Sequence, residues 1–148
     1  MQSKVTWITD GNTNGVAISP DGKSLYIPDA GISKFRPSNK NPYGKRMFWA
    51  FDMSGSGTLL TNQHMLGILL TYYYDGIRAS RVGWLFASSG DGVDVIDPET
   101  GFVLGSVRVG RGSKVAVSLA FREHEMWIVG NGGVRHVKNI KARLKRDW

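Results

Sequence analysis

The sequence contains no cysteine, which excludes disulfide bonds and thiolate metal ligands. No apolar run approaches the roughly 18 residues that a membrane-spanning helix needs, and the longest run, around residues 65–74, is interrupted by Gly67. The three histidines are scattered without metal-ligand spacing. No Gly-x-Ser-x-Gly motif is present to suggest a serine hydrolase. We therefore expect no membrane partner, no histidine-based metal site and no serine nucleophile.

The first residues also lack the apolar core of a secretory signal peptide, because a polar start leads directly into a short strand-like run. A cytoplasmic location is therefore the default expectation, although a truncated N-terminus would hide such a signal. Proline is scarce, with five residues against 19 glycines. Together with many short runs of valine, isoleucine, tyrosine and tryptophan, this balance indicates strands joined by turns rather than long helices.

The net charge of +7 is concentrated at the C-terminus. Six of the 19 basic residues lie in the last fourteen positions, where Asp147 is the only acid. The remainder of the chain is nearly balanced, so no basic groove is expected along its body. We interpret residues 141–148 as a solvated basic tail, and nucleic acid is not an expected partner.

Three segments of the chain share one pattern: a short strand, a tight turn and a more aromatic strand. They begin at Asn14, Asp75 and Val117. Each continues through a glycine-containing turn into a third strand, and the second segment also shows a fourth strand, over residues 102–109. The units cover residues 5–66, 75–110 and 115–140, approximately.

Four antiparallel strands repeated at about 40-residue spacing are typical of the blades of a β-propeller. The sequence therefore predicts an all-β fold, a partial β-propeller of about three four-stranded blades over residues 5–140. A β-sandwich is the competing architecture, but it does not predict the recurrence of an Asx-Gly-aliphatic opening. The first unit is longer than the others because of the polar stretch 33–46, which we predict to be an inserted loop.

Three blades do not close a ring, since known propellers need at least four to remove their exposed strand edges. Either further blades belong to a longer parent protein, or the chain pairs with another copy. We therefore expect self-association through open blade edges.

Asn14 and Asp75 open the first strands of successive units. The innermost strands of a propeller line its channel, so these residues are expected to converge there and offer oxygen ligands for a cation such as Ca²⁺. Two ligands are too few, and the third unit has Val117 at the matching position. Asn-Gly and Asp-Gly are also strong hairpin-turn dipeptides, so a purely structural role stays open. The tyrosines at 72–74 are expected to pack at the rim.

The segment 14–27, Asn-Gly-Val-Ala-Ile-Ser-Pro-Asp-Gly-Lys-Ser-Leu-Tyr-Ile, resembles the NG(V/I)-x-(F/L)-SPDGK-x-LY signature of the senescence marker protein, gluconolactonase and lactonohydrolase family. Residues 75–77 and 90–101 look like the next block of that family, the fungal lactonohydrolases especially, and residues 126–129 are similar to its closing block. The resemblance covers roughly residues 5–140.

The resemblance implies half of a six-bladed propeller that hydrolyses a small-molecule lactone or related cyclic ester with a divalent metal in its channel. It makes Asn14 a metal ligand and Asp75 both a ligand and the catalytic general base, with Ca²⁺ the expected metal and Zn²⁺ or Mn²⁺ as alternatives. The family's other ligands, a glutamate and an asparagine from preceding blades, have no counterpart here. We therefore expect an incomplete copy lacking the N-terminal blades, and the alternative is a non-catalytic propeller fragment or interaction module.

Overall fold

The computed structural model describes residues 13–29, 33–35, 38–40, 46–57, 59–68, 70, 74–89, 91–110 and 116–141. Over these residues the chain forms thirteen β-strands, arranged in three larger antiparallel sheets and one small hairpin. In the same ranges, no helix is long and apolar enough to cross a membrane. Residues 142–148 of the predicted basic tail lie outside the described part of the chain.

Each larger sheet is a meander in which strands consecutive in the chain lie next to each other, apart from the small hairpin inserted in the first. Blade 1 comprises β1 (Ala17–Ile18), β2 (Ser24–Asp29), β5 (Met47–Met53) and β6 (Leu60–Ile68). Blade 2 comprises β7 (Ile77–Ala79), β8 (Leu85–Ser89), β9 (Gly92–Ile96) and β10 (Val103–Arg108). Blade 3 comprises β11 (Ser118–Arg122), β12 (Glu125–Gly130) and β13 (Gly133–Val137).

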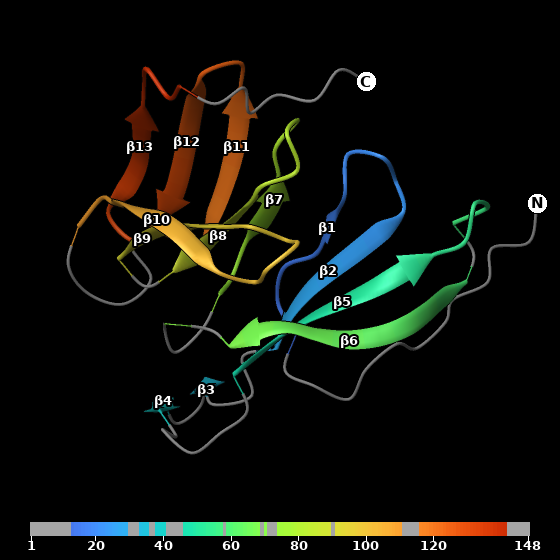
Figure 1. Ribbon diagram of the computed structural model, residues 1–148. Helices are drawn as coiled ribbons and strands as arrows, with labels where there is room; N and C mark the ends of the chain where they lie inside the picture. Colours follow the sequence, from blue (N-terminus) through green and yellow to red (C-terminus); the bar gives the residue numbers. More distant parts are fainter. Residues whose placement is uncertain are drawn as a thin grey trace, which may run out of the picture.

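The first strands of the blades, β1, β7 and β11, lie side by side, and the sheets spread away from them (Figure 1). This arrangement confirms the all-β, propeller-type fold predicted from the repeated openings. Blade 3 has three strands within the described ranges, and β13 is its last. The expected self-association through open edges stays a prediction.

The stretch 33–46, predicted to be a loop, is not structureless. It contains a two-stranded hairpin of β3 (Ser33–Phe35) and β4 (Ser38–Lys40). A polar sequence without apolar alternation gives no sign of such a strand pair, because apolar alternation is the pattern from which a strand is predicted. The loop prediction was therefore wrong for these six residues.

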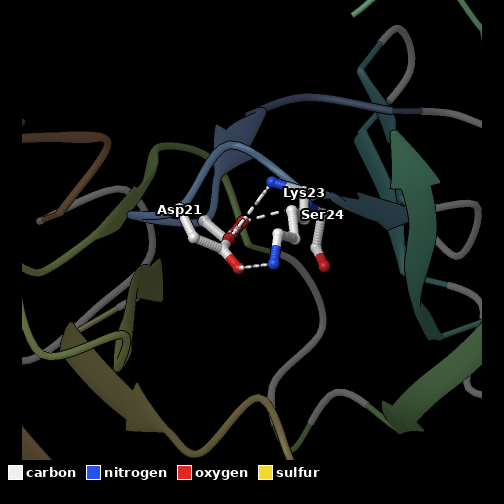
Figure 2. Close-up of polar contacts among 4 residues, drawn as sticks. Asp21, Lys23 and Ser24 are labelled. Carbon is white, nitrogen blue, oxygen red and sulfur yellow. Dashed lines mark hydrogen bonds and ion pairs between the residues drawn. The ribbon is translucent and has the colours of Figure 1, made fainter. Parts of the chain in front are cut away.

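The β1–β2 turn is held together by side chains that hydrogen-bond to its own backbone. The Ser19 hydroxyl donates to Asp21 Oδ1 at 2.6 Å and accepts from the backbone N–H of Ser24 at 2.9 Å. The backbone N–H of Lys23 donates to the same Asp21 oxygen at 3.1 Å (Figure 2). These donors, the Ser19 hydroxyl first, lower the pKa of Asp21. Gly22 completes the turn with a φ of 73°.

Ser80 occupies the same place in blade 2, since the backbone bond Ser80 N to Trp84 O matches Ser19 N to Ser24 O. The position of Asp21 is taken there by Val82, which offers no acceptor. Ser80 is fully buried, and its hydroxyl has no hydrogen-bond partner among the residues that the structure describes. The turn of blade 2 that corresponds to the Ser-Pro-Asp-Gly turn of blade 1 therefore lacks the hydrogen bonds made by Ser19 and Asp21.

We expect Ser80→Ala to raise the free energy of unfolding by about 1 kcal/mol, because it removes a buried, unsatisfied hydroxyl. The matched variant Ser19→Ala should lower it by about 1 kcal/mol, because that hydroxyl joins three groups. Urea denaturation of both variants measures the difference. Equal destabilisation by the two substitutions would contradict the assignment of a hydrogen-bonded hydroxyl to Ser19 and an unsatisfied one to Ser80.

Two apolar clusters join the blades. The cluster between blades 1 and 2 includes Tyr26, Phe48, Tyr74, Ile77, Leu85 and Ile96. The cluster between blades 2 and 3 includes Phe86, Val93, Ala116, Leu119, Met126 and Ile128. Both faces of blade 2 are therefore covered, which is why every residue of β8 is buried.

Candidate functional site

The chain enters the inner strands β1, β7 and β11 at three positions that lie next to one another, Asn14, Asp75 and Val117. These three positions form the row of inner-strand starts. The backbone N–H of Gly76 donates to the carbonyl of Val117 at 2.7 Å, so blades 2 and 3 touch here. Blades 1 and 2 are equally close, since a methyl group added at Gly15 would lie 2.2 Å from the backbone oxygen of Asp75. The structure therefore brings the backbones of the two predicted ligands together, although they are 61 positions apart.

The equivalence of Val117 with Asp75 is visible in the hydrogen bonds. The N–H of Asp75 donates to Ser88 O at 3.1 Å, and the N–H of Val117 donates to Val129 O at 2.8 Å. Each bond joins the start of an inner strand to the second strand of the same blade. Val117, 36% exposed, therefore takes the position that corresponds to the predicted ligand Asp75, but its side chain is aliphatic and has no oxygen.

The Asn-Gly and Asp-Gly pairs at this row are not hairpin turns. Neither Gly15 nor Gly76 has a positive φ, in contrast to the turn residue Gly22. A methyl group at Gly76 would lie 2.7 Å from the carbonyl oxygen of Val117. Glycine is therefore required at both positions by the close approach of neighbouring blades, not by the backbone conformation of a turn.

Asn14 is exposed and Asp75 is partly buried, so both side chains remain accessible at the end of the row. An amide oxygen and a carboxylate are donors that suit a hard cation. Asp29, which ends β2 and is buried, pairs across the backbone with Thr13, next to Asn14. In the ranges that the structure describes, however, no three histidine, aspartate or glutamate side chains form a group that could hold a metal ion.

Ser88 fixes the backbone at Asp75, a role that the sequence did not reveal. Its hydroxyl accepts from the N–H of Gly76 at 2.7 Å and lies within hydrogen-bonding distance of the carbonyls of Gly76 and Val117, at 3.0 and 2.8 Å. The side chain is fully buried. A serine inside the otherwise apolar strand 84–88 was the only available signal, and it did not indicate which segments the serine joins.

Tyr74, directly before Asp75, belongs to a buried polar group. Its hydroxyl donates to Asp94 Oδ2 at 2.8 Å, and Ser106 donates to Asp94 Oδ1 at 2.5 Å. Burial, followed by the charge of Asp94, raises the pKa of Tyr74 far above its usual range, so its hydroxyl stays a donor. Tyr74 packs as predicted, but with 1% of its side chain exposed it lies in the interior rather than at a solvated rim. Tyr72 and Tyr73 lie outside the described residues.

No profile of a known protein family matches the chain. Two curated proteins of Aspergillus oryzae are similar to it: lactonohydrolase oryH, 32% identical over 139 residues, and lactonohydrolase oryL, 32% identical over 138 residues. Each match covers 84% of this chain but only 29% and 31% of the respective relative. The chain thus spans less than a third of the length of these relatives.

Solved structures with the same arrangement of sheets are longer as well. A gluconolactonase from Xanthomonas campestris is 26% identical with a TM-score of 0.65, and 86% of this chain covers 38% of it. A luciferin-regenerating enzyme has a TM-score of 0.72 at 21% identity, and 90% of this chain covers 47% of it. The calcium-binding protein regucalcin from Agrobacterium tumefaciens has a TM-score of 0.61 at 17% identity, and 79% of this chain covers 37% of it.

Proposed function

Because the chain belongs to the gluconolactonase and lactonohydrolase family, we propose that it forms part of a metal-dependent hydrolase of lactones or related cyclic esters. The observation that carries this proposal is the row of inner-strand starts, where the backbones at Asn14 and Asp75 meet. Both residues are followed by a glycine that the neighbouring blade requires. The oxygen donors of the row therefore come from two blades at one place.

Asn14 and Asp75 are the residues that would hold the cation in this chain. Their oxygen donors fit Ca²⁺ best, with Zn²⁺ or Mn²⁺ as alternatives, and a regucalcin neighbour described as calcium-binding supports that choice. The bound cation would polarise the lactone carbonyl. Asp75 is partly buried, and the bond from its N–H to Ser88 O holds its backbone in place. Its carboxylate would accept a proton from the attacking water.

The alternative is a non-catalytic propeller segment or interaction module. The third position of the row supports this alternative, because Val117 has no oxygen to offer a cation. The two remaining ligands fall short of the six to eight oxygens that calcium takes. Water and residues of other blades would have to supply the rest. Metal affinity at Asp75 tests the proposed ligand, and metal-dependent turnover separates the two functions.

We expect Asp75→Asn to weaken calcium binding about tenfold, the effect of losing one charged ligand. Isothermal titration of the 148-residue chain with CaCl₂ measures this change. Glu99→Gln is the matched control, because it removes the same charge from the exposed β9–β10 turn and should change the affinity less than about twofold.

A lactone-opening assay with added Ca²⁺, Zn²⁺ or Mn²⁺ then tests catalysis. Turnover that depends on both the metal and Asp75 supports the hydrolase. Calcium binding without turnover favours the non-catalytic module, and an affinity that responds equally to Asp75→Asn and Glu99→Gln contradicts the metal site.

A further inference from the structure

A carboxylate is buried between blades 1 and 2, where the surroundings are otherwise apolar. Asp94 is 1% exposed, and its neighbours on the same interface include Leu85, Ala87 and Ile96. Removing a carboxylate from water is unfavourable unless hydrogen bonds replace its hydration. Asp94 receives two such bonds, from Tyr74 and from Ser106.

The buried pair of Tyr74 and Asp94 lies in blade 2, which carries Asp75, and it has no equivalent among the described residues of the other two blades. The backbone pairs Asp94 with Ala87, and the corresponding pairs are Trp49 with Ile27 in blade 1 and Arg135 with Ile128 in blade 3. The residues that occupy the place of Tyr74 in those blades are Thr13 and Ala116. Among the described residues of blades 1 and 3, these two positions thus hold no hydroxyl–carboxylate pair.

Tyr74 is connected to both neighbouring sheets. Its hydroxyl reaches the centre of blade 2 at Asp94, and its ring lies edge-on to Phe48 of blade 1, with 6.3 Å between the ring centroids. The next residue, Asp75, donates its N–H to Ser88. On the other side of the Asp75 Cα, the N–H of Gly76 donates to Val117 O. The segment that leads into β7 is therefore fixed on both sides of that Cα.

We propose that Asp94, through Tyr74, is the positioning residue for Asp75: it holds the start of β7 so that the Asp75 carboxylate stands at the row of inner strands. The metal-binding consequence rests on the proposed function, and the positioning itself does not. The costly buried carboxylate is thereby explained, because an apolar side chain in its place would leave Tyr74 without an acceptor.

The test compares Tyr74→Phe with Ser106→Ala. Each variant removes one hydroxyl from Asp94, but only the first releases the residue next to Asp75, while keeping the ring that packs on Phe48. Amide hydrogen exchange by NMR reports on the N–H of Asp75. We expect Tyr74→Phe to accelerate its exchange about tenfold relative to the amide of Phe86, and Ser106→Ala to leave the ratio unchanged.

A second pair of variants separates positioning from charge. Asp94→Asn keeps an oxygen acceptor for Tyr74 and should retain the slow exchange of Asp75. Asp94→Leu offers no acceptor, so the exchange of the Asp75 amide should become faster. We expect this even if the urea midpoint rises because the buried charge has been removed. Calcium titration of Tyr74→Phe should show about tenfold weaker binding, as removal of an outer partner of a metal ligand does.

The positioning role would be overturned if the Asp75 amide exchanged at the same rate in Tyr74→Phe, in Ser106→Ala and in the unmodified chain. This holds for any result of the calcium titration. Calcium binding that Asp75→Asn leaves unchanged would instead contradict the proposed function. The exchange data then still decide whether Tyr74 holds the segment. The two failures are therefore distinguishable.

Discussion

Replacing Phe86 with alanine is expected to lower the free energy of unfolding by about 4 kcal/mol, within the range found for large aromatic side chains in protein cores. Phe86 is 2% exposed and lies on β8, between blades 2 and 3. Its ring lies edge-on to Phe121 of β11, with 5.1 Å between the centroids and 77° between the planes. Its loss would leave a cavity in the only apolar cluster that links these blades within the described residues.

The matched control is Phe102→Ala. Phe102 directly precedes β10 and is 72% exposed, so its removal should change the free energy of unfolding by less than about 0.5 kcal/mol. Urea denaturation followed by circular dichroism measures both variants. Hydrogen exchange should also show faster opening of β11, β12 and β13 in Phe86→Ala than in the control, because those strands depend on the cluster. Similar losses for the two phenylalanines would contradict the assignment of Phe86 to the blade interface.

Gly76→Ala should lower the free energy of unfolding by about 3 kcal/mol, at the upper end for inserting a methyl group into a packed site. The added methyl would lie 2.7 Å from Val117 O and 2.9 Å from Ser118 Cα. Both are backbone atoms, so neither can rotate away as a side chain would. The hydrogen bond from Gly76 N to Val117 O would lengthen, and the row of inner strands would open between blades 2 and 3.

Gly105→Ala serves as the control for this substitution. Gly105 lies in the exposed strand β10, has no positive φ, and has no atom within 4 Å of an added methyl group. Alanine there should be neutral or stabilise the protein by about 0.5 kcal/mol, because it reduces the entropy of the unfolded chain. Thermal unfolding of both variants measures the contrast. A Gly76→Ala protein with an unchanged midpoint would show that the blades are not as close as the structure has them.

Much of the fold could be predicted because the chain repeats itself. The recurring openings at Asn14, Asp75 and Val117 predicted three inner strands in equivalent positions, and the bonds of Asp75 and Val117 to their second strands confirm the alignment. The turn of residues 97–101 correctly predicted the β9–β10 hairpin. The hairpin of β3 and β4 escaped prediction because its sequence has neither apolar alternation nor a repeat to compare with.

The sequence by itself determined the all-β class and the three equivalent inner strands, and it singled out the pair of oxygen-bearing residues, because each of these depends on local pattern and on the comparison of repeats. Only the tertiary structure decided what surrounds that pair. In the sequence, Gly15 and Gly76 resemble turn residues. In the structure, backbone atoms of the neighbouring blade lie so close to their Cα atoms that a side chain would not fit. Asp94 and Tyr74 are twenty positions apart and share no periodic relation, so only the packing within blade 2 shows that the first holds the second. Such contacts do not recur at a fixed separation along the chain, so the sequence pattern could not have predicted them.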